Sequence, residues 1–339
     1  MSAADEPNTL QFARRRAGLG PREALAAAVF ACCILGGCAL TPGGDAYKAQ
    51  YSKGILVEAA PGLPRRAQVA GVPFYSDDRN YCGPATLAAV LGYSGVRTSP
   101  EQLLTQLYTP KLDGTLQFDM LGATRRAGRL AYVLPSKLAA LFAQIAAGIP
   151  VVALQRVGVG AQDWHFAVVT GYNLDADTVN LQSSTARDLV LSIEQFDRSW
   201  APGGRWAFVV LRPGQFPANV TEFDYLNAAS PLENVAPEAA REAYQAAIER
   251  WPKAWIAMMG LGNLAYAQRD YAKAAVYFAQ ASRAHPNDGD PLNNLAQALL
   301  AAGDFPAARG TITEAIRIGK PHPDVYRKTL EQIEAASRR

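Results

Sequence analysis

The sequence predicts an α+β domain followed by an all-α region of helical repeats. Between residues 71 and 213, Ala/Leu-rich segments come first, and short segments rich in β-branched and aromatic residues follow. Helices that precede a group of neighbouring strands are typical of an α+β domain. After Pro237 the strand-like segments stop, and the sequence repeats itself with a period of 34 residues. A fixed period of this length indicates an array of helical repeats.

The length and composition of the chain are consistent with two folded domains. The chain has 339 residues, enough for two domains, and 49% of them are hydrophobic. A chain this apolar can bury a core, which argues against wholesale disorder. The net charge is +3, and the clearest basic run is the three arginines at 14–16. We therefore expect no nucleic-acid partner.

The N-terminus predicts export and a lipid anchor. The arginines at 14–16 precede twelve apolar residues at 24–35. A basic segment followed by a short apolar segment is typical of a secretory signal. Twelve apolar residues are too few to span a membrane. The sequence Leu35-Gly36-Gly37-Cys38 resembles the bacterial lipobox, which implies cleavage after residue 37 and lipidation of Cys38. Ala39 then implies sorting to the outer membrane of a Gram-negative bacterium, facing the periplasm. A cleaved signal with an incidental cysteine, or a buried hydrophobic helix, remains the alternative.

This processing changes the cysteine count. Cys32 and Cys33 would leave with the signal peptide of residues 1–37, and Cys38 would carry the lipid. Residues 38–66 then form a tether between the membrane and the first domain. Cys82 would be the one free thiol of the mature protein, and a single thiol in an exported protein is a candidate nucleophile.

The α+β domain is predicted over residues 67–213. Apolar spacing of three to four residues indicates its helices, and Gly92 and Gly148 end two of them. Short runs of β-branched and aromatic residues indicate its strands. The predicted helices are 84–91, 100–107, 116–128 and 137–147, and the predicted strands are 151–154, 166–170, 178–181 and 206–211. Residues 214–236 contain Pro, Asn and Glu and are predicted to be a linker.

Residues 237–339 are predicted to form the repeat array. Three sets of positions recur every 34 residues: Ala240, Ala274 and Ala308; Tyr244, Phe278 and Ile312; and Ala247, Ala281 and Ala315. A generic Ala-rich bundle would not keep three registers at one spacing. The pattern resembles the tetratricopeptide repeat (TPR), in which small residues lie where paired helices cross. Repeats are expected at 255–288 and 289–322, with a half repeat at 237–252 and a capping helix at 323–337.

Cys82 is followed by Gly83 and Pro84, and proline favours the first turn of a helix. The thiol is therefore expected at a helix N-terminus, where the helix dipole and free N–H groups stabilise a thiolate. The same amides could form part of an oxyanion hole. The alternative is a buried cysteine that acts as a small hydrophobic residue.

His165 favours the catalytic interpretation. It precedes an apolar strand segment that ends at Gly171, and no other histidine falls within the α+β domain. A thiol at a helix start and an imidazole on a neighbouring strand are what a thiolate–imidazole dyad requires. A strand histidine can also be an ordinary core residue, so the pairing with Cys82 carries this hypothesis.

The segment from Gly71 to Leu91, with Tyr-Cys-Gly-Pro-Ala-Thr at 81–86, and the segment Trp-His-Phe-Ala-Val-Val-Thr-Gly-Tyr at 164–172 resemble peptidase family C39 and its C39-like relatives. The resemblance covers about residues 68–213. It implies a papain-like α+β fold and a site built from a cysteine, a histidine and an Asp or Asn. By this resemblance Cys82 is the nucleophile and His165 is the base and then the acid. The chain contains no transporter segment, so an exporter function does not follow.

Two positions depart from the C39 pattern. The family usually has a glutamine five or six residues before the cysteine that donates to the oxyanion, whereas this chain has Asp77 and Ser76. An ionised carboxylate only accepts hydrogen bonds, so Asn80 is considered as a substitute donor. Ser183 lies where the family has its acidic residue, and a serine can orient the histidine ring but stabilises an imidazolium far less.

The leading hypothesis is a membrane-anchored cysteine peptidase that acts on a peptide or protein substrate, with the repeats holding a protein partner in their groove. The competing hypothesis is a weakly active or inactive peptide-binding lipoprotein that serves as a periplasmic scaffold. Acyl transfer by the same dyad is a third possibility, because it shares the thioester intermediate. His285 and His322 are expected to be surface residues in turns. The spacing of histidines and cysteines predicts neither a metal site nor a cofactor.

Overall fold

The computed structural model describes residues 62–77, 81–158 and 163–338. The predicted signal peptide, the lipidation site Cys38, most of the tether and the candidate donor Asn80 lie outside the described residues. Within the described part, no helix combines the length and the apolar character needed to cross a membrane.

An antiparallel sheet of seven strands organises the first domain. Its order is β4–β9–β5–β6–β7–β8, and β1 pairs with part of β6. The central strand β6 is hydrogen-bonded along one side to β5 and then β1, and along the other side to β7. The strands are β1 (Arg66–Gln68), β4 (Leu130–Val133), β5 (Val151–Val157), β6 (Asp163–Asn173), β7 (Thr178–Ser183), β8 (Ala186–Ser192) and β9 (Ala207–Leu211).

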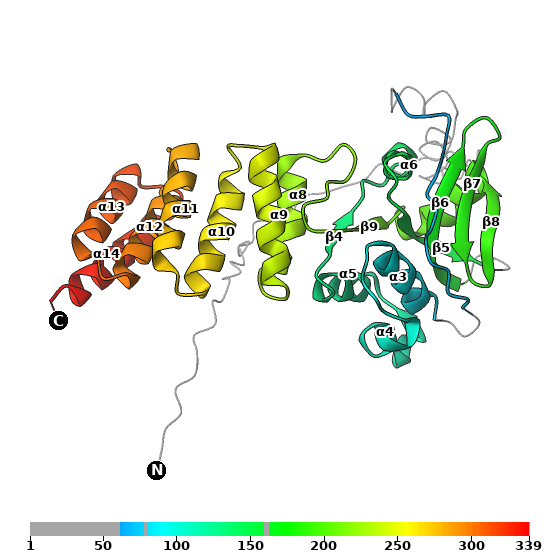
Figure 1. The fold of residues 1–339 in the computed structure, drawn as a ribbon, viewed down its shortest axis with the longest axis horizontal. Helices are drawn as coiled ribbons and strands as arrows, with labels where there is room; N and C mark the ends of the chain where they lie inside the picture. The colour runs from blue at the N-terminus through cyan, green and yellow to red at the C-terminus, as the bar shows by residue number, and fades with distance from the viewer. Residues whose placement is uncertain (1–61, 78–80, 159–162, 339) are drawn as a thin grey trace, which may run out of the picture. The chain divides into compact units, whose positions relative to one another are not determined.

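Three helices lie together beside this sheet (Figure 1). They are α3 (Cys82–Tyr93), α4 (Pro100–Leu107) and α5 (Gln117–Arg126), and α6 (Leu138–Ala146) and α7 (Ile193–Trp200) complete the domain. A small hairpin of β2 (Tyr108–Thr109) and β3 (Gly114–Thr115) joins α4 to α5. Every residue of α3 from Gly83 to Leu91 is buried. A helix that is apolar on all sides must be enclosed by its domain, which explains the Ala/Leu-rich run.

Several elements of this domain were absent from the sequence-based prediction. Strand β8 lies at the edge of the sheet and carries Arg187 and Asp188, so it lacks the apolar run of a buried strand. Helix α7 is short and starts with a capping box between Ser192 and Gln195. Strand β4 has only four residues. Strand β1 begins at Arg66, within the predicted tether, because it pairs with the far end of β6.

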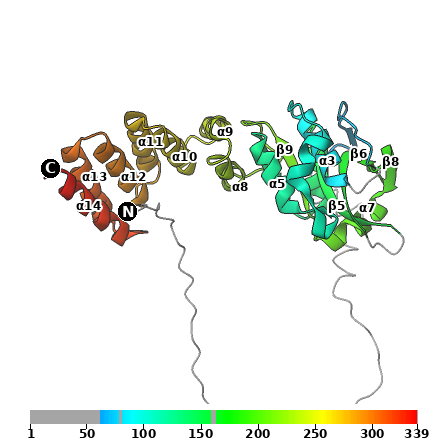
Figure 2. The same ribbon diagram turned by 90° about the horizontal axis from the view of Figure 1, so that it is seen from below.

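The repeat region consists of six helices that follow one another in chain order (Figures 1 and 2). The recurring residues of the 34-residue pattern are buried, as the repeat hypothesis requires; Ala240, Ala274 and Ala308 are each fully buried. A Cβ on Gly260 would lie 2.3 Å from the Tyr244 ring, so the glycine permits a close helix crossing. The helices are α9 (Pro237–Arg250), α10 (Trp255–Ala267), α11 (Tyr271–Ala284), α12 (Asp290–Ala301), α13 (Phe305–Ile318) and α14 (Pro323–Ala336).

Helix α14 ends the repeats with an amphipathic face, as expected for a capping helix. Its buried side includes Tyr326 and Ile333. Thr329 on this side donates to Asn293 Oδ1 on α12 across 2.8 Å. His285 and His322 lie at the ends of repeat helices, and their side chains are 45% and 60% exposed, in line with the surface positions that the sequence predicted.

The segment 214–236 contains a helix, α8 (Glu222–Ala229), where the sequence predicted a linker. Thr221 caps this helix by accepting from the Asp224 N–H. The Tyr225 ring is fully buried and packs 4.4 Å from the ring of Phe216, which also lies against Trp251. The same apolar core extends from the sheet through α8 to α9 and α10. Tertiary packing of these aromatic residues explains why a Pro-containing segment is structured.

Candidate active site

Cys82 is the first residue of α3, two positions earlier than the helix start that the sequence predicted. Tyr81 is the N-cap, and its carbonyl accepts from the Ala85 N–H at 2.9 Å. Pro84 then falls in the first turn, where its missing N–H costs no hydrogen bond. The thiol therefore lies at the helix N-terminus, among amide groups that no carbonyl of the same helix can satisfy.

Gly83 allows the β2–β3 hairpin to approach the start of α3. A Cβ at this position would lie 2.4 Å from Oγ1 of Thr115 and 2.6 Å from its Cβ. Since real Cβ atoms do not come this close to another heavy atom, any larger residue would displace the hairpin or the helix. Gly83 thus fixes the surroundings of the neighbouring thiol.

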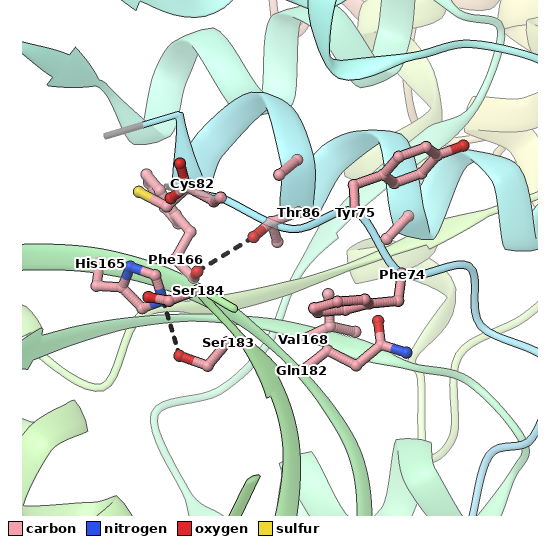
Figure 3. Close-up of a pocket in the computed structure, with 13 residues that line it drawn as sticks. Phe74, Tyr75, Cys82, Thr86, His165, Phe166, Val168, Gln182, Ser183 and Ser184 are labelled. Carbon is pink, nitrogen blue, oxygen red and sulfur yellow. Dashed lines mark hydrogen bonds between the residues drawn. The ribbon is translucent and has the colours of Figure 1, made fainter. Parts of the chain in front are cut away.

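His165 lies near the start of β6 and is 7% exposed. Its Nε2 is 2.8 Å from the hydroxyl oxygen of Ser183 on β7. The other ring nitrogen, Nδ1, is on the side that faces Cys82 (Figure 3). In the tautomer with the proton on Nε2, the imidazole donates to Ser183 and leaves Nδ1 able to accept the thiol proton.

A hydrogen bond between the two elements holds the pair in place. Thr86, one turn after Cys82 on α3, donates its hydroxyl proton to the carbonyl of Phe166, the residue after His165 (Figure 3). The two oxygens are 3.1 Å apart, and the bond is buried. The position of the thiol relative to the imidazole is therefore set by side-chain packing and by this bond together.

Asp77 completes the group. One ligand-type atom from each of Asp77, Cys82 and His165 lies within 4.8 Å of the other two. The Asp77 Oδ1 accepts from the Tyr81 N–H at 2.7 Å, and the Asp77 N–H donates to the Ser184 carbonyl at 3.0 Å. Ser184 has φ 51°, in the left-handed region that serine seldom adopts. Ser184 begins the two-residue turn between β7 and β8, and tight hairpin turns of this length require a positive φ.

Burial dominates the protonation of the dyad. It raises the pKa of the Cys82 thiol, and the charge of Asp77 raises it further, whereas the N–H groups of Phe166 and Gly83 act in the opposite direction. Burial also lowers the pKa of His165, against a smaller opposing effect of Asp77. The sequence led us to expect a thiolate stabilised by the helix dipole. The structure corrects this expectation, because desolvation outweighs the helix N-terminus and favours a neutral thiol beside a neutral imidazole.

These groups line a small pocket of about 20 Å³. One of its sides is aromatic, with Phe74 and Tyr75 from the segment that precedes Cys82 (Figure 3). Gln182 lines it too and donates through Nε2 to the Val72 carbonyl. Its Oε1 has no hydrogen-bond partner among the described residues. A buried amide oxygen without a partner among the described residues therefore lies in the wall of the pocket.

The structure brings together Cys82, His165, Ser183 and Asp77, four of the residues singled out in the sequence. Asn80 and Cys38 lie outside the described residues. Sequence reasoning missed Thr86 and Gln182, although both lie within or next to the segments that resemble family C39. It also found no metal-type spacing, because Asp77 and His165 are far apart in the sequence and meet only through the packing of α3 on β6.

Comparisons with known proteins agree with this architecture. Residues 62–207 match the model of the Peptidase_C39 like family. Two tetratricopeptide repeat models match residues 236–289 and 265–332. These matches confirm the prediction of a C39-like α+β domain followed by TPR repeats. No curated protein matches the chain.

Solved structures similar to this chain include proteins that are named as peptidases or proteases. A Bacillus anthracis protein named as a C39-like peptidase is 17% identical, with 43% of this chain and 98% of that chain covered and a TM-score of 0.38. A double glycine motif protease from an AMS/PCAT transporter, in complex with a leader peptide, is 19% identical over 42% and 93% of the two chains, with a TM-score of 0.32. The peptidase domain of Streptococcus ComA is 21% identical over 41% and 95%, with a TM-score of 0.34.

Proposed function

We propose that this protein is a cysteine peptidase that cleaves peptide bonds with Cys82 and His165. The observation that carries the proposal is the arrangement of three side chains from three elements. A thiol at the start of α3 faces an imidazole on β6, and the far nitrogen of that imidazole is 2.8 Å from the Ser183 hydroxyl on β7. A nucleophile, a base and a group that orients the base are the parts of a covalent hydrolase site.

The proposed reaction starts from the neutral pair. His165 Nδ1 takes the thiol proton as Cys82 Sγ attacks the carbonyl carbon of the scissile peptide bond. The tetrahedral intermediate collapses when the amine leaves with the proton from His165, and a thioester on Cys82 remains. Water, deprotonated by His165, then attacks the thioester, and the carboxylic acid and the free thiol are released. An amine in place of water would give acyl transfer.

The oxyanion of this reaction has fewer donors than a full papain-like site. The Cys82 N–H, in the first turn of α3, is the donor that the fold supplies. Asp77 stands where the family has its glutamine, and an ionised carboxylate cannot donate. Loss of one oxyanion donor raises the barrier by about 3 kcal/mol in enzymes where it has been measured. We therefore expect a slow enzyme, or one with a narrow range of substrates.

The rest of the chain supplies location and partners in this proposal. TPR repeats are protein-interaction modules, so the helices from α9 to α14 would hold a substrate or a partner protein near the first domain. Export and lipidation at Cys38 would place the protein on the periplasmic face of the outer membrane. Neither a nucleic acid nor a cofactor takes part.

One observation favours a second function, that of a peptide-binding scaffold without catalysis. The Asp77 charge opposes both the thiolate and a developing oxyanion, and Ser183 cannot stabilise an imidazolium as a carboxylate would. The aromatic pocket with Gln182 would still bind a peptide segment. Thiol reactivity separates the two functions.

The test is the rate at which iodoacetamide alkylates Cys82, followed by mass spectrometry of the Cys82 peptide in the full chain between acidic and alkaline pH. We expect wild type to react faster than His165→Ala below the ordinary thiol pKa of about 8.5, because the imidazole accepts the proton. His322→Ala, which alters an exposed histidine of the repeats, should match wild type. Coinciding profiles for wild type and His165→Ala would exclude the dyad and leave the scaffold function.

A further inference from the structure

Asp77, Cys82 and His165 also meet the requirements of a metal site. Their carboxylate, thiol and imidazole donor atoms all lie within 4.8 Å of one another. The three residues come from the loop before α3, from the first turn of α3 and from β6. We propose that these side chains bind Zn²⁺, and that the bound ion reversibly blocks the thiol.

The distances fit a zinc ion after a small contraction. In tetrahedral sites, zinc lies about 2.3 Å from sulfur and about 2.0–2.2 Å from nitrogen or oxygen, so its ligand atoms are about 3.3–3.7 Å apart. The three donor atoms of Asp77, Cys82 and His165 lie within 4.8 Å of one another, a limit that exceeds the spacing in a zinc site by about an ångström. The side chains would close that difference on binding the ion. The pocket that the three residues line, about 20 Å³, has room for a water molecule at the fourth position.

The chemistry of the donors selects the metal. One sulfur, one nitrogen and one oxygen form a mixed set of the kind that binds Zn²⁺ and its spectroscopic substitute Co²⁺. Mg²⁺ and Ca²⁺ prefer oxygen ligands alone and would be rejected. An amide at position 77 would contribute no charge, so the carboxylate of Asp77, which is unfavourable for an oxyanion, is favourable for a cation.

Groups behind the three ligands hold them in orientation. His165 Nε2 is engaged by Ser183, so Nδ1 is the nitrogen that faces Cys82 and would bind the ion (Figure 3). Metal-binding histidines almost always use their second nitrogen in this way. The Asp77 carboxylate accepts from the Tyr81 N–H through Oδ1. This bond holds one oxygen of the carboxylate that would bind the ion.

The consequence is a competition for one sulfur atom. Zinc bound to Sγ occupies the electron pair that would attack a carbonyl carbon. The thiol proton is released to solvent when the ion binds. Metal binding and alkylation of Cys82 should therefore exclude each other. This inference does not depend on peptidase activity, because it concerns binding alone.

The experiment uses the full chain with Cys32, Cys33 and Cys38 replaced by serine, so that Cys82 is the remaining thiol. Co²⁺ is titrated into the chelator-treated protein, and Zn²⁺ is then added. We expect a sulfur-to-cobalt charge-transfer band that saturates at one equivalent, disappears on addition of Zn²⁺, and is absent from Cys82→Ser. Zn²⁺ should also protect Cys82 from iodoacetamide.

Substitutions of single ligands distinguish a three-ligand metal site from nonspecific metal binding by the thiol alone. Asp77→Asn should weaken the affinity for Co²⁺ at least about tenfold, since even the loss of a group behind a ligand costs about 10–100-fold. His165→Ala should do the same, and His322→Ala, which alters a histidine beside Asp290 in the repeats, should change nothing. The proposal is overturned if wild type gives no charge-transfer band, or if Asp77→Asn binds Co²⁺ as tightly as wild type.

Discussion

The Thr86 hydroxyl and the Phe166 carbonyl form a buried hydrogen bond of 3.1 Å between α3 and β6. Each of these residues lies close in the chain to one member of the dyad. The bond therefore links the helix that carries the thiol to the strand that carries the imidazole. A substitution at Thr86 can thus change the distance between thiol and imidazole without altering either group.

Replacing Thr86 with valine should weaken this link with little change in shape. We expect a loss of about 1 kcal/mol in the free energy of unfolding, the usual contribution of one hydrogen bond, and slower alkylation of Cys82. Urea unfolding and the iodoacetamide rate measure the two effects. Thr124→Val is the matched control, because Thr124 is also buried but bonds within its own helix to the Met120 carbonyl. Thr124→Val should lower the free energy of unfolding by a similar amount and leave the alkylation rate of Cys82 unchanged. An equal loss of alkylation rate in both variants would argue against a specific role of Thr86.

Replacing Gly83 with alanine should disturb the start of α3. The new Cβ would meet the Thr115 side chain at 2.4 Å, and overpacking of this kind typically costs about 1–3 kcal/mol. Gly310→Ala provides the contrast, since Gly310 lies within α13 with nothing within 4 Å of its Cβ position. That variant should gain up to about 1 kcal/mol from helix propensity. Thermal or urea unfolding of the two variants checks the opposite signs, and a neutral Gly83→Ala would show that the hairpin yields easily.

Replacing Asp77 with glutamine should make the thiol more reactive. The Asp77 charge is one of the causes that raise the pKa of Cys82. Its removal should lower that pKa and move the alkylation profile to lower pH, and the new amide can donate to an oxyanion. The profile is measured with iodoacetamide, and Asp175→Asn, at an exposed carboxylate paired with Arg65, is the control. An unmoved profile would mean that Asp77 does not act on the thiol electrostatically.

Replacing His165 with glutamine should make the free energy of unfolding less dependent on pH at acidic pH. Burial lowers the pKa of His165 in the folded protein below the unfolded value of about 6.5. Between these two values the unfolded chain binds more protons, so the free energy of unfolding falls as the pH falls through this window. Urea unfolding at a series of pH values should show this decline in wild type and a smaller one in His165→Gln. An equal slope in wild type and His165→Gln would contradict the buried, neutral imidazole.

How much of the fold could be read from the sequence depended on where each element lies. Helix α4 was predicted with its observed bounds, and the structure shows that Pro100 and a Ser99–Gln102 capping box mark its start locally. The repeats were predicted because several registers recur at one spacing. Strand β8 and helix α8 were missed, since their stability comes from sheet pairing and from aromatic packing around Tyr225 rather than from their own sequences.

The candidate site was only partly predictable for a similar reason. Cys82 and His165 stood out as a thiol and an imidazole in suitable local settings, and the structure places them together. Their protonation could not be foreseen, because the local helix N-terminus favours a thiolate whereas the burial that raises the thiol pKa arises from the whole fold. The meeting of Asp77 with His165 likewise depends on tertiary packing.

The central position of β6 in the sheet has a consequence for the life of the chain before it folds. Cys82 precedes His165 by 83 residues, and the imidazole is positioned only when β6 is enclosed by its neighbours. During synthesis, and during any passage across a membrane as an extended chain, the sulfur has no proton acceptor beside it. In the proposed peptidase, the nascent chain would therefore carry the thiol without its base, and the pair would form only when the sheet is complete.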